Sequence, residues 1–325
     1  MRNETCALIL ALGAATLFFA QPATAAPAYP RQPLEIISPY MPGASIDTLG
    51  RIVADIAPKY FGQPVVVVSK PGAAGSLAAA DVIVSKPDGY KLLVSAQVFF
   101  ATTVRTQKIP FDANDLVPLA NFMEMRLVLC VKADSPFKTF NDLLDYARKN
   151  PGQLRWSHAG RGITPHMSGM IIFKKAGVQT VDVPYKGGAE ALAAILGGHV
   201  DVGSSVYGVV SDQVKAGKVR LLMFYTDKRY KDYPNVPTAA ELGYPDAVLP
   251  TYVGLYIHKN TPEAIKKTLM DTCRKIYDDP KLKRGIEMIG EEPKWGGPDF
   301  LRASIKKQQE IGIPVLKEIG LYVEK

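Results

Sequence analysis

Four glycine-bearing turns are the segments of this sequence best suited to bind a small molecule. They read Pro42-Gly43-Ala44-Ser45, Pro71-Gly72-Ala73-Ala74-Gly75, Gly160-Arg161-Gly162 and Lys186-Gly187-Gly188, and each precedes a stretch with helical spacing. Glycine lets the backbone approach a ligand closely, and the unpaired N–H groups at a helix start attract an anion. Any one of these turns serves equally well as a plain connector. The four together indicate a binding site for a carboxylate.

Titratable and charged side chains lie beside the third turn. His158 and His166 flank it, and each suits a hydrogen bond to a ligand as well as it suits a structural role. Arg161 would suit a bidentate clamp on a second carboxylate, and a solvent-exposed arginine is the equal alternative. The two histidines and the arginine are therefore candidates for contact with an anion.

The common enzyme motifs are missing from the sequence. It contains no G-x-x-x-x-G-K-[ST], no complete G-x-G-x-x-G, no G-x-S-x-G and no H-E-x-x-H pattern, and its four histidines have no spacing that suits a metal-binding helix. The formal net charge of +8 is spread along the chain, without the Lys/Arg-rich run that typically binds nucleic acid. We expect no catalytic residue, no metal, no cofactor and no nucleic-acid partner, although catalytic groups can converge from distant segments.

Strands, turns and helices must alternate to position these turns. The unbroken β-branched run of residues 65–68 is typical of a strand covered on both faces, and Ser76, Thr139 and Asp279 are expected to cap helices. The alternation predicts an α/β fold with mainly parallel sheets. In such sheets ligands bind beyond the carboxyl ends of the strands, where all four turns are expected.

The pattern occurs in two blocks. Residues 30–120 and residues 125–225 each repeat the strand–turn–helix order, which predicts two similar lobes. We expect the chain to return to the first lobe at its end.

The N-terminus has the layout of a secretory signal peptide. Arg2 precedes an apolar stretch over residues 7–20, and the small residues Ala23 and Ala25 form an A-x-A cleavage site. We place cleavage after Ala25, so that residues 1–25 are removed. A membrane anchor is the alternative, but the apolar stretch is short for a span.

Cysteine usage agrees with export. Cys6 would leave with the signal peptide, whereas Cys130 and Cys273 remain. An oxidising compartment permits a disulfide between them, and two buried free thiols are the preferred interpretation because both lie on apolar faces far apart in the sequence.

The turns and their surroundings together resemble the substrate-binding proteins of tripartite tricarboxylate transporters, also called Bug proteins. The resemblance covers nearly the whole mature chain and depends on the order and spacing of short motifs, each weak by itself. The motifs are Tyr29-Pro30-Arg31-Gln32-Pro33, Pro42-Gly43-Ala44-Ser45-Ile46-Asp47, Gly62-Gln63-Pro64-Val65-Val66-Val67, Lys70-Pro71-Gly72-Ala73-Ala74-Gly75, Pro87-Asp88-Gly89-Tyr90, Pro151-Gly152-Gln153-Leu154, Val183-Pro184-Tyr185-Lys186-Gly187, Leu196-Gly197-Gly198, Val200-Asp201, Val236-Pro237-Thr238 and Glu241-Leu242-Gly243.

The resemblance implies a two-lobed periplasmic-binding-protein fold of type II, in which each lobe is a mainly parallel sheet flanked by helices. We expect lobe I to comprise residues 26–123 plus 226–325, lobe II to comprise residues 124–225, and the ligand cleft to lie between them. The family implies that the lobes close on a ligand carboxylate, and that one large and one small membrane subunit perform transport. We expect a periplasmic monomer that is not an enzyme. The implied ligand-binding residues are Pro42, Gly43, Ala44, Ser45, Asp47, Ala73, Ala74, Gly75 and Ser76 from lobe I, and Gly160, Arg161, Gly162, Thr164, His166, Tyr185, Lys186 and Ser205 from lobe II.

Several positions depart from the family pattern. Ala44 replaces the second glycine of the first turn, and Ala74 and Ser76 stand where glycine and asparagine are common. Arg161 replaces a small or amide residue. Ser205 replaces an aspartate that would suit an amine, which disfavours an amino acid and leaves a dicarboxylate or an aromatic carboxylate as the expected ligand.

Three functions remain open at this point. The first is a carboxylate-binding protein of an uptake system, the second a ligand-loaded partner of a membrane sensor, and the third a secreted α/β enzyme. Phe99 and Phe100 follow a lobe I strand and would either line the ligand pocket or pack in the core.

Overall fold

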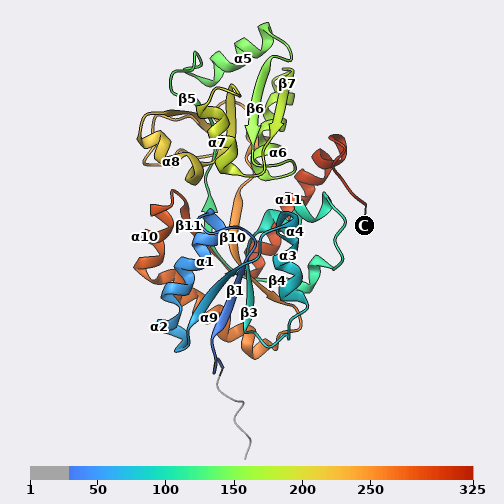
Figure 1. Cartoon of the computed structure of the whole chain (residues 1–325), viewed down its shortest axis with the longest axis vertical. Helices are drawn as coiled ribbons and strands as arrows, with labels where there is room; N and C mark the ends of the chain where they lie inside the picture. The colour runs from blue at the N-terminus through green and yellow to red at the C-terminus, as the bar shows by residue number, and fades with distance from the viewer. Residues whose placement is uncertain (1–28, 325) are drawn as a thin grey trace, which may run out of the picture.

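Two β-sheets form the frame of the molecule, which a computed structural model describes over residues 29–324. The predicted signal peptide and its cleavage site lie outside the described residues. Figure 1 shows the first sheet in the lower part of the view and the second in the upper part. The first has strand order β11-β4-β10-β3-β1-β2 and the second β7-β6-β8-β5-β9. The strands of the first sheet are β1 (Leu34–Ser38), β2 (Val65–Ser69), β3 (Lys91–Ala96), β4 (Leu116–Met125), β10 (Thr251–His258) and β11 (Glu292–Gly296). The strands of the second sheet are β5 (Leu127–Lys132), β6 (Leu154–His158), β7 (Thr180–Pro184), β8 (Val202–Val206) and β9 (Val219–Phe224).

The α/β class is confirmed, but both sheets are mixed and not mainly parallel. In the first sheet β1 pairs in parallel with β2 and β3, whereas β10 is antiparallel to β3 and β4, and β11 is antiparallel to β4. In the second, β6 is parallel to β7 and β8, while β5 is antiparallel to β8 and β9. The antiparallel strands β5 and β10 are those by which the chain enters one sheet from the other. The parallel strands of each sheet end at the junction between the halves. A strand that enters from the other half starts at that junction and therefore runs in the opposite direction.

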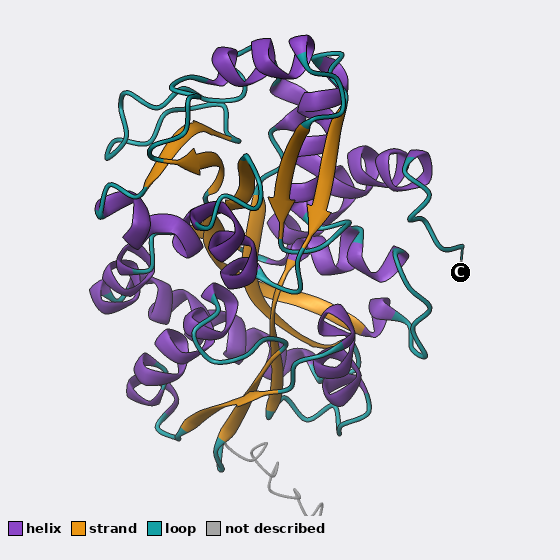
Figure 2. Ribbon diagram, turned by 45° about the horizontal axis from the view of Figure 1, so that its top comes forward, coloured by secondary structure: helices purple, strands orange, loops and turns teal. Residues whose placement is uncertain are grey.

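Helices cover both faces of the sheets, as Figure 2 shows. The helices are α1 (Ser45–Ile56), α2 (Pro58–Phe61), α3 (Ser76–Ile83), α4 (Gln97–Ala101), α5 (Phe140–Lys149), α6 (Thr164–Lys175), α7 (Gly188–Leu196), α8 (Tyr207–Lys215), α9 (Glu263–Asp278), α10 (Pro280–Met288) and α11 (Pro298–Glu318). Successive side chains of β1 point to opposite faces of the first sheet, so this half of the molecule has two core clusters, one on each face. Ile36 packs in a cluster with α1, α9 and α10, and Ile37 packs in a second cluster with α3, α4 and α11.

The edge position of β2 corrects one expectation from the sequence. Residues 65–68 do form a strand, but it lies at the end of the sheet, and Val66 is 46% exposed. A run of β-branched residues fits any pleated, partly buried surface, so composition alone does not separate an edge strand from a central one.

Helix α11 also reaches the second half of the molecule. Leu316 near its end packs in a small apolar cluster with Met167 of α6 and with Leu249, which precedes β10. Lys174 of α6 forms an ion pair with Glu318. The two sheets are therefore joined by the strand crossings and also by a helix packed across the junction.

Two of the predicted caps are confirmed and one is wrong. Thr139 forms a full capping box with Asp142 at the start of α5, and Asp279 accepts a backbone N–H at the start of α10. Ser76 is the first residue of α3, not its cap, because the left-handed Gly75 takes the capping position.

Both remaining cysteines are free and buried, as the preferred interpretation expects. Cys130 lies on β5 and Cys273 on α9, in separate core clusters. Burial raises the pKa of each thiol to about 12.

Candidate functional site

The first turn leads from β1 to the N-terminus of α1. Gly43 has φ of +94°, which a residue with a side chain rarely adopts, and Ala44 is extended without a side-chain capping bond. Pro42 and Gly43 are exposed. The first N–H groups of this helix of 12 residues therefore lack a side-chain cap and remain available to an anion.

Asp47 holds this turn in place through its carboxylate. The side chain is fully buried and accepts hydrogen bonds from Arg51 Nε at 2.7 Å and from Ser69 Oγ at 2.9 Å. Burial by itself would raise the pKa of this carboxyl, but the hydrogen bonds from Arg51, Ser38 and Ser69 outweigh it and lower the pKa. Of the groups of Asp47, the backbone N–H is thus the one left for a ligand.

The second turn has four consecutive residues with positive φ. The values are +132° at Gly72, +45° at Ala73, +49° at Ala74 and +95° at Gly75. Each of the two alanines in this region costs about 1–2 kcal/mol, and such strain persists only where the surroundings enforce it. The strain at Ala73 and Ala74 therefore indicates that contacts with neighbouring residues hold the backbone of this turn in one conformation.

Gln107 is the side chain that enforces this turn, and sequence reasoning missed it. Its Nε2 donates to the Ala73 carbonyl at 2.7 Å and to Ser76 Oγ at 2.9 Å. Gly75 is buried against the ring of Phe99, which packs in the core beside Phe100. No sequence signal distinguishes Gln107, because its neighbours in space are 31 or more residues away in the chain.

The third turn comes from the second sheet and contacts the same first-sheet segment. Gly160 and Gly162 have φ of +130° and +79°, and a methyl group added at Gly162 would lie 2.9 Å from Thr106 Cγ2. Thr106 precedes Gln107, so one short segment contacts the second turn and the third. Two turns that are distant in sequence are thereby brought together.

Two more contacts join the predicted residues across the junction. Thr251 Oγ1 of β10 donates to Thr164 Oγ1 of α6 at 3.0 Å. A methyl group added at Gly208, at the start of α8, would lie 3.2 Å from Ser45 Oγ of the first turn. Of the predicted residues, Ser45, Gly162 and Thr164 therefore contact the other half at the junction.

The fourth turn and Ser205 make their hydrogen bonds within their own half. Tyr185 N–H donates to the His158 carbonyl at 2.9 Å, and Lys186 N–H donates to Glu190 Oε2 at 3.2 Å. Ser205 Oγ is mostly buried and donates to the Val206 carbonyl at 3.3 Å. Their predicted contact with a ligand stays a prediction.

Arg161 forms an ion pair with Asp182. The sequence suggested either a clamp on the ligand or a solvent-exposed arginine, and neither interpretation included a partner within the protein. Arg161 Nε donates to Asp182 Oδ2 at 2.8 Å and its Nη2 donates to Asp182 Oδ1 at 3.2 Å. Burial would raise the pKa of Asp182, but the bonds from Arg161 outweigh it and lower the pKa. Arg161 is thus neither a free clamp nor a free surface arginine. The only trace of Asp182 in the sequence is an isolated acid between Val181 and Val183 of a strand.

The two histidines lie beneath this ion pair. His158 Nε2 is 3.4 Å and His166 Nε2 is 3.8 Å from Asp182 Oδ2, and both rings are almost fully buried. Burial lowers the pKa of His158, against the attraction of Asp182. Burial and the neighbouring His158 lower the pKa of His166 to about 4. Both rings are therefore expected to be neutral at pH 7.

Among the described residues, His158, His166 and Asp182 are the group whose side-chain atoms come close enough to hold a metal, all within 4.8 Å of one another. The hydrogen bonds of these three residues argue against metal binding. Gly162 N–H donates to His166 Nδ1 at 3.1 Å, which places the proton of the neutral ring on Nε2, the atom that faces Asp182. Arg161 also occupies Asp182 Oδ2. The group fits an ion pair supported by neutral imidazoles better than a three-ligand metal site.

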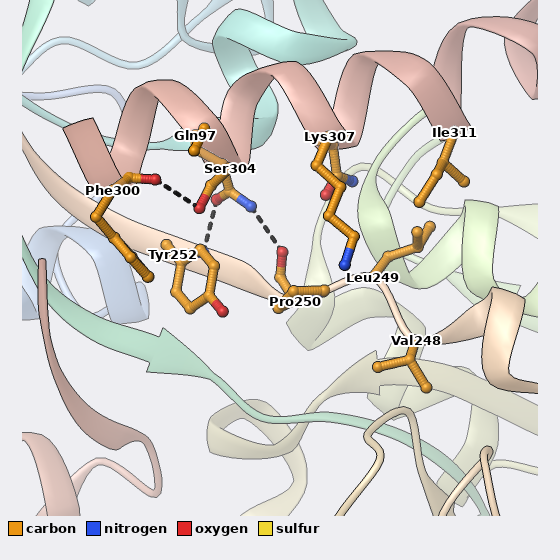
Figure 3. Close-up of a pocket in the computed structure, with 11 residues that line it drawn as sticks. Gln97, Val248, Leu249, Pro250, Tyr252, Phe300, Ser304, Lys307 and Ile311 are labelled. Atoms are coloured by element: carbon orange, nitrogen blue, oxygen red, sulfur yellow. Dashed lines mark hydrogen bonds between the residues drawn. The ribbon is translucent and has the colours of Figure 1, made fainter. Parts of the chain in front are cut away.

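A separate cavity of about 210 Å³ lies between α11 and residues 248–252, the segment that leads into β10. Figure 3 shows its wall, in which Gln97 donates to the Pro250 carbonyl and accepts from Tyr252 N–H. No predicted ligand-binding residue lines this cavity. Of the predicted residues, Ser45, Gly162 and Thr164 contact the other half directly instead.

Two helix-covered α/β halves, joined by strand crossings and meeting at uncapped helix starts, define the class of two-lobed solute-binding proteins. Within that class, residues 49–321 match the family described as the tripartite tricarboxylate transporter family receptor, and the chain belongs to this family. The resemblance to this family is therefore confirmed.

Similar proteins agree with this assignment. A Cupriavidus necator protein described as "UPF0065 protein in gbd 5'region" is 35% identical over 319 residues, which cover 96% of this chain and 95% of that protein. Protein BugT of Bordetella pertussis is 27% identical, over 94% of this chain and 95% of its own length. The solved structure of R. palustris Rpa4515 with adipate has a TM-score of 0.82 and 25% identity, covering 90% of this chain and 99% of that chain. Among residues 29–324, no helix has the length and apolar character needed to cross a membrane.

Proposed function

We propose that this protein captures a small organic carboxylate between its two halves and delivers it unchanged to one large and one small membrane subunit of a transporter. The observation that carries the proposal is the junction of the turns. Ser45 at the start of α1 lies against the start of α8, and Gly162 before α6 lies against the segment that holds the second turn. Helix starts from both sheets therefore come into contact across the junction, and their N–H groups favour an anion.

The proposed ligand is a dicarboxylate or an aromatic carboxylate, not an amino acid. Arg161 supplies a guanidinium next to the third turn, and the acid beside it, Asp182, is neutralised by that same arginine. Position 205 carries a serine in place of an acid that would suit an amine. The similar protein Rpa4515 was solved with adipate, a dicarboxylate, which supports this class.

Capture is proposed to proceed by closure of two lobes, residues 26–123 plus 226–325 and residues 124–225. The chain passes between the sheets at Arg126 and again between β9 and β10, and these crossings supply the hinge. The closed arrangement is favoured only by ligands that bind it more tightly than the open one. We propose a periplasmic location and a monomeric state for the mature chain.

A thermal-shift panel with adipate, succinate, terephthalate, benzoate and glutamate tests the function. A bound carboxylate at about 100 times its Kd stabilises the native state by about 2.7 kcal/mol, which is a shift of several degrees. Native mass spectrometry of the same samples should show one ligand of unchanged mass. No shift and no adduct with any member of the panel would contradict the proposal.

Gly43 and Gly62 offer a matched pair of variants for the same panel. Both have positive φ, +94° and +67°, and neither has any atom within 4 Å of an added methyl group. Gly43→Ala and Gly62→Ala should therefore lose similar stability, on the order of 1 kcal/mol. Only Gly43→Ala, which bends the first turn, should weaken carboxylate binding. Equal binding by both variants would remove the first turn from the site.

A further inference from the structure

Glu291 is a fully buried carboxyl group at the junction of the two sheets. It lies just before β11, and its Oε2 accepts the backbone N–H of Arg126, the residue between β4 and β5, at 2.8 Å. Its Oε1 faces the start of α8, since a methyl group added at Gly208 would lie 2.7 Å from this oxygen and 3.2 Å from Ser45 Oγ. One carboxyl group therefore contacts the chain crossing, the first turn and a helix of the second half.

The surroundings of Glu291 do not suit a carboxylate anion. Oε1 is buried and has no hydrogen-bond partner of ordinary geometry within the part of the chain that the structure describes, although the Ser45 hydroxyl and the Gly208 N–H lie near enough to the carboxyl to lower its pKa. The guanidinium of Arg126 is turned toward Asp232, at 2.7 Å, and toward Glu292. Burial raises the pKa of Glu291 to about 8, against the opposing contributions of Arg126, Ser45 and Gly208. Arg126 and Tyr230 are the titratable groups that interact electrostatically with Glu291, and the Tyr207 ring lies beside the preceding Gly290. Asp232 and Glu292 pair with the Arg126 guanidinium.

We propose that Glu291 is a positioning residue for ligand capture: as a neutral carboxylic acid it holds Ser45 of the first turn against the start of α8. Ionised, it places a buried negative charge in that contact and beside the proposed anion site, so the two halves separate more readily. The inference rests on the proposed function, because Ser45 and α8 are taken to meet when a carboxylate is held.

The sign of the resulting pH dependence follows from linkage. In the proposed open state Glu291 is exposed to water, where a carboxyl has a pKa of about 4.3, whereas its burial at the junction raises the pKa to about 8. Between these two values closure takes up one proton, so affinity falls as pH rises. The affinity for the ligand falls by at most about tenfold per pH unit, and above about pH 8 it no longer changes with pH.

The test measures the affinity for adipate, or for the tightest-binding panel member, at pH 6, 7 and 8, where simple dicarboxylates are ionised. Wild-type affinity should fall by between about threefold and tenfold per unit, while Glu291→Gln, which keeps the shape without the titration, should vary by less than about twofold overall. Glu292→Gln is the matched control, since this neighbouring carboxylate pairs with Arg126 away from Gly208, and it should keep the wild-type slope. Equal slopes in wild type and Glu291→Gln would overturn the inference.

Calorimetry of the wild-type protein keeps the test independent of how well Glu291→Gln folds. Titrations at pH 7 in two buffers of different ionisation enthalpy should show uptake of close to one proton per ligand, and no uptake would overturn the inference. Binding at pH 7 without proton uptake would leave the proposed function standing and remove only the role of Glu291. Absence of binding by the whole panel would remove both.

Discussion

The ion pair between Arg161 and Asp182 leads to a prediction about ligand choice. The guanidinium is held by both carboxylate oxygens of Asp182, at 2.8 and 3.2 Å. A second carboxylate on the ligand must therefore compete with an internal one. Replacing Asp182 with asparagine removes the competing charge while retaining the shape, and leaves the guanidinium available to the ligand.

The exposure of the pair sets the size of the effect. The side chains of Arg161 and Asp182 are 50% and 27% exposed, so solvent screening limits the pair to about 1 kcal/mol despite its bidentate geometry. Since 1.4 kcal/mol corresponds to tenfold, Asp182→Asn should bind a dicarboxylate about fivefold more tightly than wild type does. A monocarboxylate of the same length, which does not reach the arginine, should show no change.

The assay is the ratio of the Kd for hexanoate to the Kd for adipate, measured by calorimetry at pH 7. Asp182→Asn should raise this ratio about fivefold, and Arg161→Gln should bring it below the wild-type value. Asp201→Asn is the matched control, because Asp201 is similarly exposed at 28% and lies 3.7 Å from Arg155 on the same sheet, outside the predicted ligand residues. It should leave the ratio unchanged. An identical ratio in wild type and Asp182→Asn would refute the assignment of Arg161 to the second carboxylate.

Two further predictions concern stability. Gly162→Val should lower the free energy of unfolding in urea by about 2–3 kcal/mol, because the new side chain would lie 2.9 Å from Thr106 and the backbone has a φ of +79°. Gly177→Val, with a φ of +66° and open space around it, should cost only about 1 kcal/mol. Equal losses would mean that Gly162 is not packed against Thr106. His166 has its pKa lowered to about 4 by burial, so the folded state should lose stability as pH falls from about 6.5 to 4, by about 3 kcal/mol at most. His166→Asn should flatten that part of the stability profile in chemical unfolding at pH 7 and 4.5, and an unchanged slope would show that the ring titrates normally.

Several structural features were predictable from the sequence because they depend on neighbours in the chain. The cap of α5 by Thr139 and the left-handed turns at Gly43 and Gly160 follow from side-chain or backbone chemistry within a few residues. The α/β class follows from the alternation of strand and helix patterns. The family assignment follows for the same reason, since short motifs kept in order identify turns that local sequence specifies.

The order and direction of the strands, and the side chains that contact the site residues, were not predictable from neighbours in the chain. The antiparallel course of β5 and β10 depends on where the chain crosses between halves, and the edge position of β2 depends on which strands assemble beside it. Gln107 and Asp182 carry no local signal, although they hold Ala73 and Arg161 across 34 and 21 residues of sequence.

By itself, the sequence determined the turns, two of the three caps and the family, since turns and caps are interactions between residues close in the chain and the family follows from short local motifs. Only the tertiary structure decided which charges are paired and which carboxyl is buried, as Arg161 and Glu291 show. The physical reason is that charge state depends on desolvation and on the nearest opposite charge, and both are set by groups that folding brings together from distant parts of the chain.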